Sequence, residues 1–558
     1  MIKFLPVLLC AAVAVHAAEI PLKWTSGNLK PAVNGRVYRF RSTENDASAL
    51  RLSGKLIVPS KGVRVELEFK DDAQQSNRYP RLFVIGDFSL QLEATPASAD
   101  KVAKVMLTDP KNPRRYIQIP VPAVHHPENW HHVVCTLEPR AKLMTLQFDR
   151  GEVKRHPLVF DLPTKPVPLL LGASRVNKSN RGYNGFIRNV SVTYPYDPDP
   201  VKGVKTVFDL EPPKVNGVPV RHFTVAAVPG RHLAFPGVAK LPGGDLAVVF
   251  REGAEHVCPY GRICMTISKD GGRNWSAPFA ICDTETDERD PSIHVLPDGR
   301  IFVSLMAWNS WTRAKSTAEK FPQASEYVKQ AGLPRSGYSQ YMFSSDGGKT
   351  WTGRKIGDSN IFCPHGPACK GGYFYQPATG RDNGKRQIHM YRVSADATQV
   401  EKIGLVGETE NGHGSIVPIY VEPHTAVLPD GTLVTAIRVD CDGHMRISFS
   451  KDDGRTWTKP EKTPLRGFPH HLLVLKDGRL LATYGYRYHP MGVRACISTD
   501  GGKTWDIERE MVIQNNGLNG DLGYPVSIEL DDGEVLTVYY HITGKHPQCY
   551  IEGAIYRP

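Results

Sequence analysis

The sequence lacks the features that mark membrane-spanning and nucleic-acid-binding proteins. After the first 18 residues, no apolar run is long enough to cross a bilayer. The 558 residues carry a net charge of +12, but the basic residues are scattered and form neither a basic run nor a recognition helix. The ten cysteines contain no Cys-x-x-Cys pair, so a zinc site built on cysteine is not expected. The excess of positive charge therefore indicates an acidic partner such as a glycan, and not nucleic acid.

The amino-terminal residues combine a lysine, an apolar run and small residues. This pattern is typical of a secretory signal peptide over residues 1–18, and it predicts a secreted or periplasmic protein. Cys10 raises the alternative of a cell-surface lipoprotein, but Leu9 is bulky where a small residue is expected. For the nine cysteines that follow we expect at most one or two disulfides, with Cys258–Cys264 or Cys363–Cys369 as candidates.

A turn pattern, Ser-x-Asp-x-Gly-x-x-Trp, occurs four times in the carboxyl-terminal two-thirds of the chain. Each copy follows an alternating apolar run such as ICMTIS, so each is a turn that leaves a β-strand. Asp and Gly suit the tight turn, and Trp offers a large apolar face that packs on the sheet. The copies are Ser268–Trp275, Ser344–Trp351, Ser450–Trp457 and Ser498–Trp505. Four copies predict a repeat protein built from small antiparallel sheets.

Short strand pairs joined by a glycine turn define six repeat units. They start near Leu241, Leu296, Cys369, Leu428, Leu475 and Leu530. Six four-stranded sheets arranged radially form a six-bladed β-propeller, and the strand Arg221–Ala227 is expected to complete the last sheet. We therefore predict an all-β chain with a propeller over residues 229–558 and a linker with the closing strand over residues 201–228.

Residues 19–200 carry none of these repeats and consist of many short predicted strands. The motif Asn-Trp-His-His-Val-Val, a strand ending in Asp-Arg-Gly and a closing strand GFIRNVSV resemble the laminin-G or concanavalin-like jelly roll. The resemblance implies a β-sandwich with either a lectin-like or a purely structural role. The segment YPYDPDP, rich in Pro and Asp, marks the start of the linker.

The turn glycines also give a register for the centre of the predicted propeller. The innermost strand of each blade lines the central funnel, so residues at equal offsets form a ring. Nine positions before the turn glycine stand Phe235, Asp290, Cys363, Glu422, Pro469 and Tyr524. Side chains alternate along a strand, so the positions seven before the glycine share that face: Gly237, Ser292, His365, His424, His471 and Val526. Buried polar groups at this density are costly unless they are hydrogen-bonded or functional, so the two rings predict a site.

From about residue 229 to the end, the chain resembles the sialidases, whose Asp boxes are similar to the repeated turns. The stretch VEPHTAVLPDGTLVTAIR is similar to the sialidase segment in which a glutamate opens the inner strand and a triad arginine closes the next one, which here are Glu422 and Arg438. The stretch LGYPVSIELDDGEVLTVYY is similar to the segment that carries the nucleophilic tyrosine, here Tyr524. The resemblance implies an exo-acting glycoside hydrolase that acts on sialylated or other acidic glycans without a metal or another cofactor.

The chain departs from the sialidase pattern at two places: it lacks the first-blade arginine and the acid/base aspartate. Sialidases open the first blade with Phe-Arg-Ile-Pro, but this chain has Leu-Ala-Phe-Pro at residues 233–236, so that arginine is missing. Arg231, Arg251 or Arg289 could replace it, and Arg487 or Arg494 could supply the arginine of the fifth blade.

The loop that carries the acid/base aspartate in sialidases reads REGAEHVCPYG here and has no aspartate. Glu255, His256 or the ring residue Asp290 could do that work. We favour Glu255 or His256, because they lie on the loop where sialidases place this residue and the leaving group is expected to point out of the funnel towards solvent.

The chemistry of these residues leaves three hypotheses open. In the first, Glu422 takes the proton of Tyr524, a poor nucleophile while it is a neutral phenol, and arginines bind the substrate carboxylate. In the second, the chain is a lyase or hydrolase of uronic-acid glycans, in which Tyr524 and a histidine transfer protons. In the third, it binds glycans without turnover. We expect the ring histidines His365, His424 and His471 to bind substrate oxygens, with a metal site as the alternative.

Overall fold

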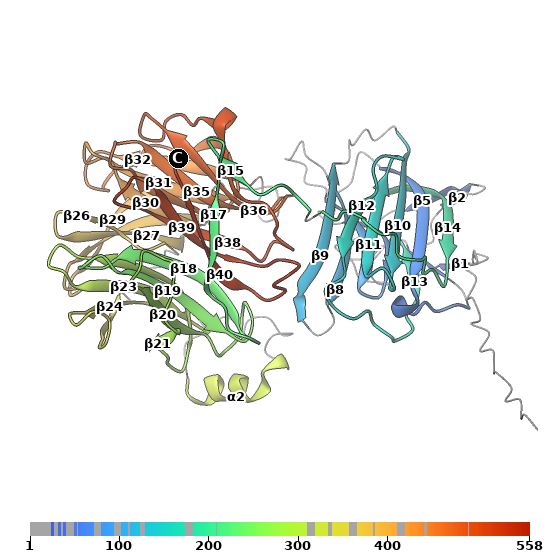
Figure 1. Ribbon diagram of the computed structural model, residues 1–558, viewed down its shortest axis with the longest axis horizontal. Helices are drawn as coiled ribbons and strands as arrows, with labels where there is room; N and C mark the ends of the chain where they lie inside the picture. Colours follow the sequence, from blue (N-terminus) through green and yellow to red (C-terminus); the bar gives the residue numbers. More distant parts are fainter. Residues whose placement is uncertain are drawn as a thin grey trace, which may run out of the picture. The chain divides into compact units, whose positions relative to one another are not determined.

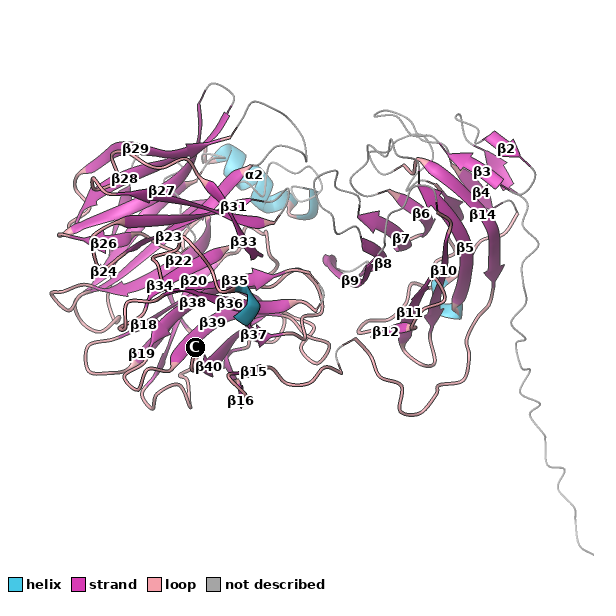
Figure 2. Cartoon of the chain, turned by 90° about the horizontal axis from the view of Figure 1, so that it is seen from above, coloured by secondary structure: helices cyan, strands magenta, loops and turns pink. Residues whose placement is uncertain are grey.

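A computed structural model shows an all-β chain that divides into two compact units, the first ending at Val207 and the second covering residues 208–558. The structure describes residues 24–26, 32–34, 37–40, 49–52, 54–71, 80–93, 102–109, 112–122, 129–172, 182–207, 209–309, 319–332, 337–356, 365–382, 385–409, 419–439, 443–488 and 490–558. Strands dominate both units (Figure 2). The predicted signal peptide and the ring residue Cys363 lie outside the described residues. No helix in the described ranges is long and apolar enough to cross a membrane.

The first unit consists of two seven-stranded antiparallel sheets. One sheet has the order β1 (Trp24–Ser26), β4 (Leu50–Leu52), β13 (Leu169–Leu171), β6 (Arg81–Ile85), β7 (Phe88–Glu93), β8 (Val102–Asp109) and β9 (Asn112–Pro122). The other has the order β12 (Lys154–Pro157), β11 (Leu143–Phe148), β10 (His131–Glu138), β5 (Val63–Asp71), β14 (Gly185–Thr193), β3 (Val37–Phe40) and β2 (Ala32–Asn34). In β5 the side chains alternate strictly between buried and half-buried, as expected of a strand with one face on a core.

The second unit contains six four-stranded antiparallel sheets, and many of their strands are labelled in Figure 1. The first three are β18 (His232–Lys240), β19 (Leu246–Gly253), β20 (Arg262–Ser268) and β21 (Phe279–Cys282); β22 (Asp287–Val295), β23 (Ile301–Trp308), β24 (Tyr338–Ser344) and β25 (Thr352–Ile356); and β26 (Ala368–Lys370), β27 (Tyr373–Asp382), β28 (Lys385–Ser394) and β29 (Val400–Glu408). The next two are β30 (Tyr420–Val427), β31 (Leu433–Val439), β32 (His444–Ser450) and β33 (Glu461–Arg466); and β34 (His470–Val474), β35 (Leu480–Tyr486), β36 (Gly492–Ser498) and β37 (Met511–Gln514).

The sixth sheet is completed by a strand that precedes the first one in the sequence. It has the order β17 (Arg221–Ala226), β40 (Tyr550–Tyr556), β39 (Val535–His541) and β38 (Gly523–Glu529). The closing strand predicted from the sequence therefore pairs with β40. A two-stranded ribbon, β15 (Lys214–Val215) with β16 (Val218–Pro219), the helix α2 (Pro322–Gln330) and two short 3-10 helices, η1 (Pro59–Lys61) and η3 (Ile507–Arg509), complete the described elements.

Each of the first five sheets packs against the next through a hydrophobic cluster. The first and second sheets share one that includes Val249 and Val303, and the four following interfaces have similar clusters. The sixth sheet contacts the first, where the Phe235 ring lies 4.8 Å from that of Tyr524 and 5.5 Å from that of Tyr540. The packing therefore runs through all six sheets and returns to the first.

The four Ser-Asp-Gly-Trp turns join the third and fourth strands of their sheets, and their hydrogen bonds explain the motif. In the first copy, the Ser268 hydroxyl donates to Asp270 (2.8 Å) and accepts the Gly272 N–H (2.8 Å). Asp270 also accepts the Asn274 N–H (2.9 Å), and the Trp275 indole donates to the Gly272 carbonyl (3.2 Å). These contacts within one turn fix its conformation, so the motif is structural.

The predicted disulfides are wrong. Cys258, Cys264 and Cys369 are free thiols in the structure, which rules out both the Cys258–Cys264 and the Cys363–Cys369 pairing. Cys258 instead accepts a hydrogen bond from Arg251 (3.2 Å), and Cys264 lies 3.4 Å from a carboxylate oxygen of Glu252. A large core supplies the stability that small exported domains take from disulfides.

Candidate active site

Four residues of the predicted ring share an uncommon backbone conformation. Phe235, Asp290, Glu422 and Tyr524 have φ angles of 56°, 48°, 45° and 51°, in the left-handed region. Each stands where the pairing of the first and second strands of its sheet shifts register, as at a β-bulge. Such a conformation costs about 1–3 kcal/mol per residue and is concentrated at functional sites. The counted register therefore picked out a repeated structural feature.

Tyr524, Glu422 and Arg438 meet directly, although they come from the fourth and sixth sheets. The Tyr524 hydroxyl donates to Glu422 Oε1 at 2.7 Å. Arg438 Nη1 donates to Glu422 Oε2 at 2.5 Å and to the Tyr524 hydroxyl at 3.4 Å. The side chains of Arg438 and Glu422 are 13% and 18% exposed, so a ligand can reach them. The contact predicted from the sequence is confirmed.

The surroundings of Tyr524 keep its phenol neutral. Burial raises the pKa of Tyr524 well above its usual range, and the nearby charge of Glu422 adds to this, while Arg438 and Arg487 oppose it. A neutral phenol must lose its proton as its oxygen attacks an electrophile. Glu422 already accepts that proton in a hydrogen bond, so it is placed to take it.

A second guanidinium group lies beside the first. Arg487 is 5.8 Å from the centre of the Tyr524 ring, and both Arg487 (5.3 Å) and Arg438 (4.4 Å) lie over the ring of Phe468. Arg487 Nε donates to the carbonyl of Leu522 at 3.0 Å. Of the two arginines expected for the fifth blade, Arg487 is the one that lies beside Tyr524 and over the Phe468 ring.

A third guanidinium group belongs to Arg289, on β22. It stacks on the Phe235 ring at 4.9 Å, and that ring in turn contacts Tyr524. Arg289 Nη1 donates to Asp287 Oδ2 (2.9 Å) and to the carbonyl of His256 (2.7 Å). Two anchors thus fix the orientation of Arg289 before any ligand arrives.

Two predicted substrate arginines have other partners, and the structure corrects both. Arg251 is fully buried and bonds to Asp287 (2.7 Å) and to the carbonyl of Glu255 (2.8 Å). Arg494, also buried, donates to the carbonyls of Gln514 (2.7 Å) and Pro490 (3.0 Å). Their donors hold loops in place and do not face a ligand. Arg231, the other replacement considered, pairs with Glu252 at 2.8 Å.

The three acid/base candidates have different environments. Glu255 pairs with Lys320, and His256 Nδ1 lies 2.7 Å from Asp521 Oδ1. Burial lowers the pKa of His256 to about 3. Burial also raises the pKa of Asp290 to about 7, with Arg289 opposing the rise. Asp290 is therefore the candidate that carries a proton near neutral pH.

The ring histidines form a cluster below Tyr524. The ring of His365 lies 5.5 Å from His424, 5.7 Å from His471 and 6.1 Å from Tyr524, and burial lowers the pKa of all three histidines. The Leu472 N–H donates to His424 Nδ1 at 3.0 Å, so a neutral His424 carries its proton on Nε2. That nitrogen is a donor and not a metal ligand, which favours contact with oxygen atoms over the metal alternative.

Sequence reasoning missed the loop residue Asp521 and the strand residue His232, which lie 3.0 Å apart beside this site. Asp521 stands three positions before Tyr524, outside both counted rings. The only available signal was its place in the loop that leads into the tyrosine strand.

Comparison with known proteins finds a repeat-domain family and two sialidases. A family model described as a BNR repeat-like domain matches residues 324–538. A sialidase from Clostridium perfringens is 23% identical over 269 residues, which are 44% of this chain and 53% of that protein. A sialidase from Bacteroides fragilis (strain YCH46) is 22% identical over 306 residues, which are 50% of this chain and 54% of that protein. The chain thus spans about half the length of these curated relatives.

Among solved structures, a variant of the NanB sialidase from Streptococcus pneumoniae aligns over 95% of this chain and 99% of its own, at 13% identity and a TM-score of 0.44. The evidence for the family is the repeat domain, its four turns and the two curated relatives. The chain is therefore similar to the sialidases, and this similarity supports a divergent relationship to their superfamily.

Proposed function

We propose that this protein is an exo-acting glycoside hydrolase of sialidase type, which releases a terminal acidic sugar, with sialic acid as the first substrate to test. The observation that carries the proposal is the hydrogen bond of 2.7 Å between the Tyr524 hydroxyl and Glu422, bridged by Arg438. A tyrosine nucleophile suits an anionic sugar, because a neutral phenol is not repelled by the substrate carboxylate as a carboxylate nucleophile would be.

The proposal includes a six-bladed β-propeller, in which each of the six four-stranded sheets is one blade. The sheets pack one against the next and the sixth contacts the first, and four of their first strands carry a left-handed residue. In a propeller, this arrangement would bring the reactive groups to one end of a central funnel. A funnel of this kind takes the end of a glycan chain, in agreement with exo-action.

In the first chemical step, the Tyr524 oxygen forms a bond to the anomeric carbon while its proton moves to Glu422. The bond from that carbon to the oxygen of the leaving sugar breaks, and Asp290 protonates this oxygen. Asp290 takes this role because its pKa, raised to about 7, lets it carry a proton at neutral pH. The sequence had favoured Glu255 or His256 for this role. The pairing of Glu255 with Lys320 and the low pKa of His256 argue against both.

The substrate carboxylate is bound by Arg438 and Arg487, with Arg289 on the other side of Phe235. Guanidinium groups hold carboxylates through paired, planar hydrogen bonds. His365, His424 and His471 offer neutral nitrogens deeper in the funnel for sugar hydroxyl groups. For export, we propose that residues 1–18 act as a secretory signal, which a mature protein beginning near residue 19 would support.

A second function, a lyase of uronic-acid glycans, is favoured by one observation. His256 is neutral and paired with Asp521, as a base that removes a proton next to a carboxylate would be. The same arginines would neutralise the uronate.

The experiment that separates these functions is incubation with a mixed panel of sialylated and uronate-containing glycans. Free sialic acid released by the wild-type protein but not by Tyr524→Phe supports the hydrolase. An unsaturated uronate product supports the lyase. Binding without any product would refute both and leave a glycan-binding protein.

A further inference from the structure

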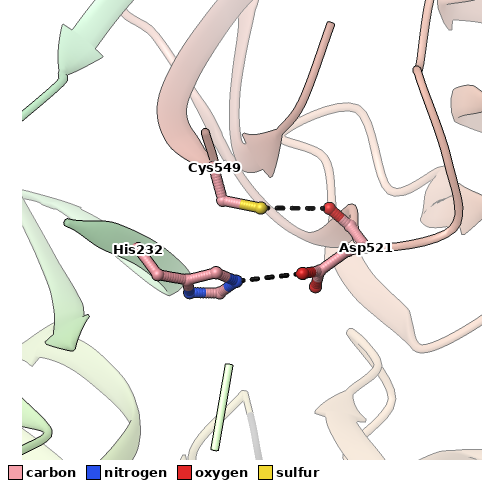
Figure 3. Close-up of side chains that lie close together, drawn as sticks. All are labelled: His232, Asp521 and Cys549. Atoms are coloured by element: carbon pink, nitrogen blue, oxygen red, sulfur yellow. Dashed lines mark hydrogen bonds and ion pairs between the residues drawn. The ribbon is translucent and has the colours of Figure 1, made fainter. Parts of the chain in front are cut away.

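Asp521 is held in one position by hydrogen bonds to all of its polar atoms. Its carboxylate lies 2.7 Å from His256 Nδ1 and 3.0 Å from His232 Nε2. Its backbone N–H donates to Asn519 Oδ1 (2.8 Å), and its carbonyl accepts from the Cys549 thiol (3.4 Å). Figure 3 shows His232 and Cys549 pointing at Asp521 from two sides. A side chain fixed in this way acts as an anchor for the two imidazoles.

The anchor determines where His256 carries its proton. Burial alone would raise the pKa of Asp521, but the two imidazoles beside it hold the pKa well below its usual range. Asp521 is therefore a carboxylate, which can only accept hydrogen bonds. A neutral His256 consequently carries its proton on Nδ1, which leaves Nε2 with a free lone pair.

The His256 ring lies beside the aromatic rings that surround Tyr524. The His256 ring lies 5.3 Å from Phe235 and 6.5 Å from Tyr540, the two aromatic rings that also contact Tyr524. The side chain of His256 is 24% exposed, whereas that of Asp521 is 13% exposed. The imidazole can thus meet water while its carboxylate partner is largely shielded.

We infer that His256 is the general base of the second half-reaction and that Asp521 is its positioning residue. The inference rests on the proposed hydrolase function. His256 Nε2 takes a proton from a water molecule whose oxygen bonds to the anomeric carbon. The bond from that carbon to Tyr524 breaks, and the electron pair returns to the phenol oxygen, which recovers its proton from Glu422. The proton on His256 then passes to solvent, and Asp290, which lost its proton to the leaving group in the first step, takes one back from solvent.

The charged and titratable groups around His256 act on its protonated form in opposite directions. Asp521 stabilises the protonated ring that forms, while His232 on β18 and Arg289 on β22 disfavour it, and Tyr540 on β39 is neutral. Burial keeps His256 neutral in the resting protein. A neutral ring can accept a proton but cannot serve as the acid of the first step, so the acid and the base are two different residues.

A metal ion is the competing use of this cluster. His232, Asp521 and Cys549 have ligand atoms within 4.8 Å of one another. However, the second nitrogen of His232 has no hydrogen-bond partner among the described residues, whereas metal-bound histidines normally donate that nitrogen to an acceptor. The carboxylate of Asp521 is also occupied by two imidazoles.

The test uses activated aryl glycosides of the sugar released in the panel experiment. A good leaving group speeds the first step, so the second step limits turnover, and loss of its base should trap the glycosyl group on Tyr524. We expect His256→Gln and Asp521→Asn each to lower kcat by about 100-fold or more, with a burst of aryl alcohol. Intact-mass analysis should show a covalent sugar adduct, and azide, which needs no base, should restore turnover. The double variant should be little worse than either single one, because the two residues act as a unit.

His232→Gln is the matched control, because glutamine keeps an N–H donor towards Asp521, and it should change kcat by no more than about threefold. Wild-type rates without an adduct in both Asp521→Asn and His256→Gln would overturn the inference. So would activity that is lost with a chelator and restored by zinc. Full turnover by Tyr524→Phe would instead refute the proposed function, since the nucleophile would be wrong whatever His256 does.

Discussion

Replacing Glu422 with glutamine tests the proposed mechanism most directly. Glutamine has the same shape and keeps an oxygen that can accept the Tyr524 hydrogen bond of 2.7 Å, but it cannot take the proton. General base catalysis contributes a factor of about 100 to 10,000, which corresponds to about 2.7–5.5 kcal/mol of activation free energy at 1.36 kcal/mol per tenfold. We therefore expect kcat/KM for an aryl glycoside to fall within that range.

The substitution also changes two charges that can be followed separately. The Glu422 charge is one cause of the raised pKa of Tyr524, so Glu422→Gln should lower that pKa. An absorbance titration of the phenolate can detect this shift. Arg438 loses its ion-pair partner, and because the pair is partly exposed, the free energy of unfolding should fall by only about 1–2 kcal/mol.

The control for Glu422→Gln is Tyr524→Phe, alone and combined with it. Once the nucleophile is gone, removing the base should cost almost nothing more, because the two side chains act in one step. Activity of Glu422→Gln within threefold of wild type would refute the argument. So would fully additive losses in the double variant.

Three further predictions concern neighbouring residues. Arg438→Lys keeps the charge but loses the planar fork, so kcat/KM should fall by about 5- to 150-fold (about 1–3 kcal/mol), while Arg273→Lys in an exposed turn should have no effect. Because Asp290 acts while protonated, activity on natural glycans should decline as pH rises through about 7. Asp290→Asn should be slow on natural glycans at every pH but nearly normal on aryl glycosides, and equal losses on both substrate classes would contradict its role as the acid. Gly261→Ala would put a methyl group 1.7 Å from Asp287 Oδ1, so urea unfolding should show a loss of at least about 1–3 kcal/mol, and an unchanged midpoint would contradict this packing.

The centre of the second unit could be predicted from the sequence because local signals determine it. Each turn glycine closes a strand pair at a fixed place, so counting back nine residues reaches the same left-handed position in the first, second, fourth and sixth sheets. The count found Glu422 and Tyr524, which are 102 residues apart in the sequence and 2.7 Å apart in the structure. The closing strand β17 was also predictable. The sixth unit runs out at the carboxyl terminus before it has four strands, so the strand that precedes the first unit is available to complete the sixth sheet.

Side-chain partners outside the repeat could not be predicted in this way. Arg251 and Arg289 look equivalent in the sequence, and both donate hydrogen bonds to Asp287. Only Arg289 also lies over the ring of Phe235. The partnership of His256 with Asp521 spans 265 residues and joins two loops, for which no periodic pattern exists. The disulfide candidates failed for a related reason, since cysteine spacing says nothing about where the side chains point.

The left-handed residues explain why counting nine residues back from each turn glycine reaches equivalent positions. They also show where the alternation of side chains along a strand is interrupted. At each bulge the first strand carries one residue more than its partner, so strict alternation is broken between the two counted rings. Both rings nevertheless reach the centre, since the His365 ring lies 6.1 Å from that of Tyr524.

Phe235 has the same left-handed conformation as Asp290, Glu422 and Tyr524, although its side chain has no ionisable group. The bulge is therefore a feature of the repeat and does not depend on a reactive side chain. In the sialidase pattern an arginine stands just before this position, where the chain has Ala234. Here Arg289 comes from the next sheet and stacks on Phe235. Arg289 thus places a positive charge beside the position where the first sheet lacks one, and the proposed binding of an acidic sugar would use this charge.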